Sequence, residues 1–98
     1  MTDFCHEGWS ETEPATEEIQ RICDEVKGQV EERTNTKYGI FRALQYRSQV
    51  VEGMNYLIKI HAGGFIYLHV MVFEAYGGKL SVIGVEEGHT KEDPLVPF

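Results

Sequence analysis

The chain has 98 residues, of which 42% are apolar and 26% are charged. This length suits one domain, and no apolar run is long enough for a helix that spans a membrane. Sixteen acidic against nine basic side chains give a net charge of -7. Because that charge repels phosphate backbones and anionic lipid, neither nucleic acid nor a membrane is an expected partner. We expect a single soluble domain over residues 1–98.

The N-terminal segment and the cysteines favour a cytoplasmic protein. Residues 1–7 lack the basic region and apolar block of a secretory signal. The two cysteines, Cys5 and Cys23, are too few for the disulfide framework of a small secreted domain. Cys23 falls at an apolar helix position and is expected to be a buried thiol, whereas Cys5 is expected to be exposed. Residues 1–13 carry no periodicity, so we expect a flexible N-terminal trunk there.

A helix is predicted from Glu17 to about Arg33. Thr16 is a suitable N-cap, and Glu17 and Glu18 place negative charge in the first turn, where the helix dipole favours it. Apolar residues recur at the helical period and form one stripe, made of Ile19, Ile22, Cys23, Val26 and Val30. Gly28 lies off this stripe and costs about 1 kcal/mol of helix propensity, which packing of the stripe must offset.

Four strands are predicted after the helix, at about residues 38–48, 54–61, 65–74 and 79–86. The turn signals that separate them are Glu52-Gly53, Gly63-Gly64 and Gly77-Gly78. The apolar alternation shifts phase between Ala43 and Leu44, which predicts a β-bulge in the first strand. The pattern predicts an α+β fold, with an antiparallel sheet of four or five strands wrapped around one helix.

The central hairpin has a testable register in which His61 lies opposite Phe65. One face is then apolar and fits the helix stripe, because it pairs Ile60 with Ile66, Ile58 with Leu68 and Tyr56 with Val70. The other face pairs Lys59 with Tyr67 and Leu57 with His69. We expect this mixed face to be half exposed to water.

No set of residues predicts an enzyme, a metal site or a cofactor. His61 and His69 lie apart in the expected register, and a metal site needs three or four converging ligands. A nucleophilic Cys/His pair is not expected, because Cys23 lies on the buried stripe and Cys5 has only a histidine neighbour in the trunk. His89 lies in a polar C-terminal segment and is interpreted as a solvated side chain.

The connection between the first two strands, Gln49-Val50-Val51-Glu52-Gly53, carries two valines where hairpin turns are normally polar. Together with Tyr38-Gly39 and Asn55-Tyr56, it resembles the Gln-x-Val-x-Gly loop of the cystatin superfamily, and specifically its disulfide-free stefin branch. The likeness runs from about Gly8 to Phe98 and includes Pro14-Ala15-Thr16, Glu31-Glu32 and Val72-Phe73. Stefins have the fold predicted above, with a short additional strand before the helix, and they inhibit papain-like cysteine proteases such as the lysosomal cathepsins.

The resemblance implies a wedge that enters the active-site cleft of the protease and blocks it reversibly. Antiparallel order places the turns at 49–53 and 76–78 on one edge of the sheet, where the trunk can join them. The implied protease-binding residues are Gly8, Trp9, Gln49, Val50, Val51, Glu52, Gly53, Tyr76, Gly77 and Gly78. The expected partners are cathepsins of the L, S, H and B class. A monomer is expected, with a domain-swapped dimer as the alternative.

Several alternatives stay open at the level of sequence. The valines could pack back onto the sheet, and Tyr76 could be a core residue. Glu52 stands where stefins commonly have alanine, so it could face solvent or bias which proteases are accepted. The trunk glycine of stefins matches Gly8, although alignment on the proline before the helix places Glu7 there. The second hairpin, residues 75–79, is shorter than in stefins and lacks their Leu-Pro. A non-inhibitory binding module on this scaffold is the alternative function.

Overall fold

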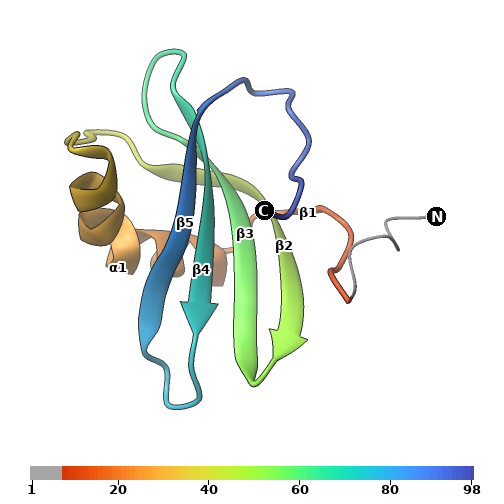
Figure 1. The fold of residues 1–98 in the computed structure, drawn as a ribbon. Coiled ribbons are helices and arrows are strands. Elements are labelled where there is room, and N and C mark those ends of the chain that lie inside the picture. The colour runs from red at the N-terminus through yellow and green to blue at the C-terminus, as the bar shows by residue number, and fades with distance from the viewer. Residues whose placement is uncertain (1–7) are drawn as a thin grey trace.

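The computed structural model describes residues 8–98, which form one helix and one five-stranded antiparallel sheet (Figure 1). In chain order the elements are β1 (Glu13–Pro14), α1 (Glu17–Thr34), β2 (Arg42–Val51), β3 (Gly53–His61), β4 (Tyr67–Glu74) and β5 (Leu80–His89). The strands keep this order in the sheet. The predicted α+β fold, an antiparallel sheet wrapped around one helix, is confirmed.

The ends of α1 are set by its capping residues. The Thr16 Oγ1 accepts a hydrogen bond of 3.2 Å from the Ile19 N–H, which satisfies one free donor of the first turn. Asn35 closes the other end in the left-handed conformation, with φ of 54°. The predicted N-cap is therefore confirmed, and the helix ends one residue beyond Arg33. No described helix combines the length and apolar character that a membrane span requires.

The main core lies between α1 and one face of the sheet. All five residues of the predicted helix stripe are buried there. The sheet contributes almost fully buried side chains, namely Ile58, Ile60, Leu68, Val70 and Val72. Each such burial stabilises the fold by about 1.5–3 kcal/mol. The helix is thus held by tertiary packing, which offsets the low propensity of Gly28.

Strand β2 differs in extent from the predicted strand. It begins at Arg42, and Tyr38 and Phe41 lie before it as buried rings that stack with centroids 5.7 Å apart. It also extends through the expected connection as far as Val51. The register shift at Ala43 confirms the predicted bulge.

The predicted register of the central hairpin is wrong by two residues. His61 pairs with Tyr67, and Phe65 lies in the turn with 97% of its surface exposed. The turn is longer than expected because Gly63 and Gly64 both take positive φ, and the Ala62 N–H donates to the Ile66 carbonyl at 2.9 Å. A slip of two residues preserves the side-chain faces, so the apolar face was assigned correctly except for residues in the turn.

The opposite face of the sheet is covered, which corrects the expectation of a half-wet surface. The C-terminal tail returns across it (Figure 1), and Leu95 packs there with Leu57 and Met71. Two buried cations hold the tail in place. Arg47 Nη1 donates to the Leu95 carbonyl, and Lys59 Nζ donates to the Lys91 carbonyl, each at 2.7 Å.

The segment before the helix runs along β2. β1 pairs Glu13 with Tyr46 and Pro14 with Gln45, which supplies the short strand that the stefin resemblance implied. The Ser10 N–H donates to the Ser48 carbonyl at 2.7 Å. These bonds restrain residues 9–15, most of which the sequence had placed in a flexible trunk.

Candidate functional site

Two turns lie together at one end of the sheet, below the strands in Figure 1, and we call this end the hairpin edge. It consists of the β2–β3 turn around Glu52 and the β4–β5 turn at residues 75–79. Met54 at the start of β3 pairs with Glu74 at the end of β4. The two turns therefore adjoin across the sheet, as antiparallel order predicted.

The β2–β3 turn is tight and presents Val50 to solvent. Strand pairing continues to Val51 opposite Gly53, so Glu52 alone lies outside a strand. Val50 is 78% exposed and Val51 is half-buried. The Asn55 Nδ2 donates a 2.9 Å hydrogen bond to Gln49 Oε1, which ties the two strands together at the base of the turn. The alternative that the valines pack back onto the sheet is excluded for Val50.

Gly53 is required by both conformation and packing. Its φ is 118°, a region that side-chain-bearing residues rarely adopt. A Cβ at this position would lie 2.4 Å from the Glu74 carbonyl oxygen and 3.1 Å from the Phe73 ring. Any larger residue would push the β2–β3 turn away from β4, so Gly53 sets the distance between the two turns.

The β4–β5 turn exposes an aromatic side chain. The Ala75 N–H donates to the Lys79 carbonyl and the Gly78 N–H to the Ala75 carbonyl, each at 2.9 Å. Gly77 and Gly78 take φ values of 96° and 95°, which closes the turn within five residues. Tyr76 is 79% exposed at its tip. The alternative that Tyr76 is a core residue is therefore wrong.

The trunk reaches β2 near the hairpin edge. Trp9 forms a bridge with Gln49 and packs, half-buried, against the cluster of Leu57, Met71 and Leu95. Gly8 is exposed, with φ of 87°. Trp9 therefore anchors the start of the described trunk. Glu7, which is the alternative to Gly8 at the trunk glycine position, lies outside the described residues. Cys5 and His6 lie outside them as well.

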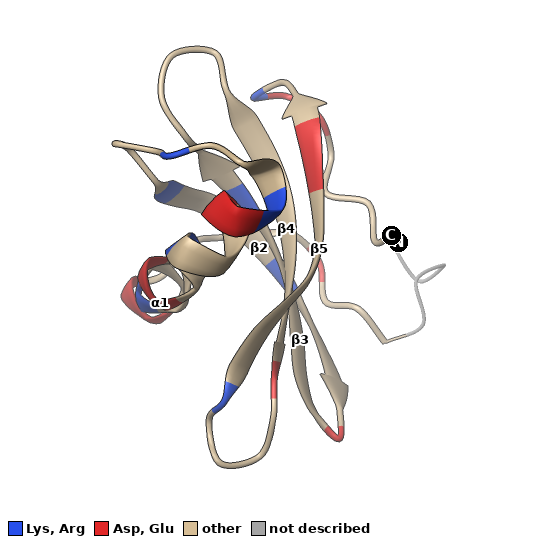
Figure 2. Cartoon of the chain, turned by 60° about the vertical axis from the view of Figure 1, so that its left-hand side comes forward, with Lys and Arg blue, Asp and Glu red and all other residues tan. Residues whose placement is uncertain are grey.

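Charge is sparse at the hairpin edge, as Figure 2 shows. Glu52 is exposed at one turn, whereas Glu74 and Lys79 flank the other. Glu74 accepts a 3.3 Å hydrogen bond from the Tyr56 hydroxyl. Burial, together with the Glu74 charge, raises the pKa of Tyr56 to about 12, so this hydroxyl stays protonated as a donor. Among residues 8–98, the edge offers apolar surface and backbone groups but no nucleophile with an adjacent base.

Comparison with known proteins decides the family, because a cystatin domain matches residues 8–93. The chain belongs to the cystatin family. Over 93 residues it is 46% identical to Cystatin-A of Mus musculus, spanning 93% of this chain and 96% of that protein. It is 48% identical over 94 residues to Leukocyte cysteine proteinase inhibitor 1 of Sus scrofa, spanning 93% and 91%. It is 41% identical to Stefin-2 of Mus musculus along the full length of both chains.

Membership confirms the stefin resemblance found in the sequence. Cystatins inhibit cysteine proteases and are not enzymes, so the predicted class of function is confirmed as well. The cystatin contains one described cysteine, and its environment agrees with a non-catalytic role. Cys23 is buried in the main core, where desolvation and the neighbouring Asp24 raise the pKa of its thiol to about 12. A thiol this weakly acidic is a poor nucleophile.

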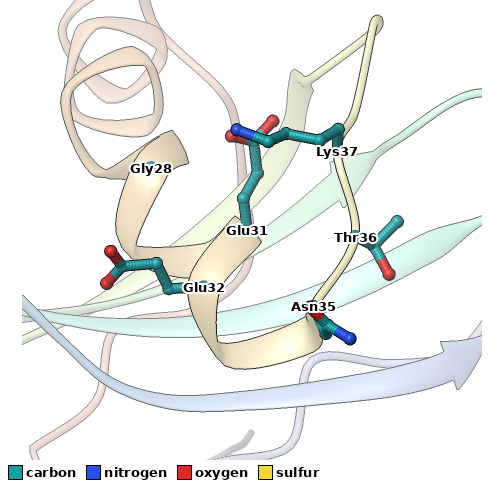
Figure 3. Close-up of a pocket in the computed structure, with 6 residues that line it drawn as sticks. All are labelled: Gly28, Glu31, Glu32, Asn35, Thr36 and Lys37. Atoms are coloured by element: carbon teal, nitrogen blue, oxygen red, sulfur yellow. The ribbon is translucent and has the colours of Figure 1, made fainter.

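A shallow hollow of about 340 Å³ lies at the C-terminal end of α1. Figure 3 shows that it is lined by the last turns of the helix and the segment that follows, with Gly28, Glu31, Glu32, Asn35, Thr36 and Lys37. Glu31 already accepts a hydrogen bond from the Tyr38 N–H at 3.0 Å. The hollow of this cystatin is thus part of the C-terminal end of α1 and its link to the next segment.

One polar cluster of the cystatin was not found from its sequence. His89 was interpreted as a solvated side chain, but it is half-buried at the end of β5 and stacks on buried His69, with ring centroids 3.6 Å apart. Its two ring nitrogens lie 2.8 Å from Glu86 Oε1 and 2.7 Å from Asp93 Oδ2. Burial acts to lower the pKa of His89, but these carboxylates raise it overall. The local signals were the two carboxylates within four residues of His89 and Gly88, which lies at the bulge with φ of 78°.

Proposed function

We propose that this cystatin binds papain-like cysteine proteases of the cathepsin L, S, H and B class reversibly and tightly, with its hairpin edge in the active-site cleft. The observation that carries the proposal is the pair formed by Val50 and Tyr76, which are 78% and 79% exposed on adjoining turns. Exposed apolar side chains gathered on one rim are typical of a surface that a partner covers. The cleft of a protease is such a partner.

Stiffness explains how a small edge can bind tightly. Val50 is β-branched, and its turn is held by strand pairing up to Val51 opposite Gly53. Little conformational entropy is therefore lost on docking. An interface of standard size buries about 800 Å² per partner and supports nanomolar binding when its centre is well packed.

The proposed wedge comprises ten residues, which are Gly8, Trp9, Gln49, Val50, Val51, Glu52, Gly53, Tyr76, Gly77 and Gly78. Val50 and Tyr76 supply the central apolar contacts, flanked by Val51 and the polar Glu52. The glycines shape the turns, Gln49 braces one turn through its bond with Asn55, and Trp9 anchors the trunk on the sheet. No peptide bond of the wedge has to lie at the attacking sulfur, so the inhibitor occludes the cleft without being cleaved.

We further propose a cytoplasmic monomer. Cys23 is a free thiol buried in the core, as is usual for a protein of a reducing compartment. The main core is complete within one chain, because α1 covers the apolar face of its own sheet. In a domain-swapped dimer the β2–β3 turn would straighten and Val50 would leave the hairpin edge, so inhibitory activity belongs to the monomer.

Titration of papain or a cathepsin L-like enzyme tests the proposal. A monomeric fraction should abolish peptidase activity at a one-to-one ratio. Val50→Asp should weaken the inhibition constant by about 30-fold or more, because a charge replaces a central apolar contact. Phe65→Asp is the matched control, since Phe65 is 97% exposed at the other end of the sheet and its replacement should leave inhibition unchanged.

Full protease activity in excess wild-type protein would contradict the proposed targets. Equal inhibition by Val50→Asp and the wild type would contradict the proposed wedge. A pull-down from lysate that recovers a partner but no protease would favour the non-inhibitory binding module.

A further inference from the structure

Three potential metal ligands converge on the face of the sheet opposite α1. The ligand atoms of His69, Glu86 and His89 all lie within 4.8 Å of one another. Their strands lie side by side, with His69 on β4 and the other two on β5. The cluster lies five residues along β4 from Glu74, or about 17 Å at the rise of a strand, so it is separate from the hairpin edge.

A β-bulge brings the three side chains to one face. Tyr67 pairs with His89, but His69 pairs with Glu86, so β5 contains one extra residue between these pairs. Gly88 absorbs the extra residue with φ of 78°. In a regular strand, residues three apart point to opposite faces. The bulge is therefore what allows Glu86 and His89 to act together.

His69 has ligand capacity that the described protein does not use. Its side chain is fully buried, and neither Nδ1 nor Nε2 has a hydrogen-bond partner among residues 8–98. Burial of an imidazole without hydrogen-bond partners is unfavourable, so an apolar residue would stabilise this position better than His69 if its only role were packing. A neutral imidazole has one ring nitrogen without a proton, so His69 offers an unused lone pair on this face of the sheet.

The second nitrogen of His89 is held as it is in many metal sites. Its Nδ1 lies 2.7 Å from Asp93 Oδ2, while Nε2 faces Glu86. Asp93 is itself fixed by the Thr90 hydroxyl and N–H, at 2.7 and 3.2 Å. A carboxylate behind a ligating histidine orients the ring and raises its basicity.

We propose that His69, Glu86 and His89 bind a divalent transition-metal ion such as Zn²⁺, with Asp93 orienting His89. Two imidazoles and a carboxylate are donors that Zn²⁺ accepts, and water completes the tetrahedral coordination. Tetrahedral ligands at about 2.1 Å from the metal lie about 3.4 Å apart. In the metal-free protein Glu86 Oε1 lies 2.8 Å from His89 Nε2, and the His69 and His89 rings are stacked with centroids 3.6 Å apart. Metal binding therefore requires the two rings to splay apart and Glu86 to move away from His89.

The charged groups around the cluster favour a cation. Glu86 and Asp93 carry two negative charges, and Lys59 on β3 carries one positive charge whose Nζ is directed to the Lys91 carbonyl. In the metal-free protein His89 Nδ1 faces Asp93 and Nε2 faces Glu86. An ion between Nε2 and Glu86 requires an unprotonated Nε2, so any proton held there passes to solvent. The bound ion crosslinks β4 and β5 beside the C-terminal tail.

Calorimetric titration of the full chain with ZnCl₂ tests the site. The measurements use a Cys5→Ser, His6→Ala background, because the thiol and the imidazole of these adjacent trunk residues could bind Zn²⁺ themselves. One Zn²⁺ per chain should bind, and His89→Ala or Glu86→Gln should weaken its Kd by about tenfold or more. The matched control is His61→Ala, because His61 contacts Gly64 outside the cluster, and it should bind as the parent does.

Two further measurements keep the test independent of folding. His69→Leu fills the buried position with an apolar side chain, so it should remain folded by circular dichroism and lose Zn²⁺ binding. Co²⁺ should give the visible absorption of a tetrahedral site in the parent and not in His89→Ala. Absence of Zn²⁺ binding in the parent, or an unchanged Kd in both His69→Leu and His89→Ala, would overturn the proposal. Protease inhibition without added metal should be equal in all of these variants.

Discussion

The two turns of the hairpin edge adjoin in space but are shaped by different forces. In the β2–β3 turn, a methyl group on Gly53 would meet the backbone of β4 at 2.4 Å. In the β4–β5 turn, a methyl group on Gly77 or Gly78 would meet nothing within 4 Å. The first turn is therefore positioned by packing against the neighbouring hairpin, whereas the second is set by its own backbone conformation. Substitutions that look equivalent in sequence should differ in effect.

Gly53→Ala should give the largest effect in this comparison. Both the positive φ and the contact with Glu74 oppose the side chain, so we expect the free energy of unfolding to fall by at least about 2 kcal/mol. Because the turn would also move away from β4, protease affinity should fall with it. Urea unfolding and an inhibition assay provide the two measurements. Wild-type stability would show that packing does not position this turn.

Tyr76→Ala should affect binding and leave stability alone. The ring is exposed in the free protein and becomes an anchor only against the protease, so we expect affinity to fall by about 1–2 kcal/mol. The midpoint of urea unfolding should remain within about 0.5 kcal/mol of the wild type. An unchanged inhibition constant would remove the second turn from the wedge.

Gly78→Ala isolates the conformational contribution that Gly53→Ala combines with packing. Its φ is 95° and the space around it is open, so we expect a loss of about 1 kcal/mol in unfolding free energy. The difference between the two alanine variants, measured under the same urea conditions, estimates the packing contribution at Gly53. Equal losses would contradict the contrast between the turns.

Glu52→Gln should have the smallest effect. The carboxylate is exposed at the tip of the β2–β3 turn, so its removal should change the unfolding free energy by less than about 0.5 kcal/mol. The association rate with a protease and its salt dependence should change instead, because charges at the rim of an interface act mainly on encounter. Stopped-flow measurements at two salt concentrations check this, with exposed Glu87→Gln at the other end as the control. Equal rates in both variants would show that Glu52 has no role in target choice.

Local patterns were sufficient for the helix and for the position of the hairpin edge. The stripe from Ile19 to Val30 predicted the buried face of α1, and the phase shift at Ala43 predicted the bulge in β2. The turn signals identified the hairpin edge, although whether Val50 and Tyr76 pointed outward stayed open. Their exposure depends on which neighbouring residues the strands place beneath them, and a sequence does not supply that.

The errors arose where distant segments meet. Alternation predicts which face a side chain occupies, but it cannot detect a register shift of two residues, because such a shift leaves the faces unchanged. The length of the turn around Gly63 and Gly64 determined the register. The burial of the polar face could not be predicted. The C-terminal tail covers it, and this tail lies more than 30 residues along the chain from Arg47 and Lys59, which hold it. His89 was misjudged for a similar reason, since its partner His69 is on another strand.

Local chemistry along the chain was enough to specify the helix, the strands and a valine-bearing turn, because helical and strand periods and glycine conformations depend on near neighbours. Only the folded chain decided the strand register, the closing of the second sheet face and the meeting of His69, Glu86 and His89. Those features depend on contacts between segments far apart in sequence, where a bulge of one residue or a longer turn changes which side chains meet.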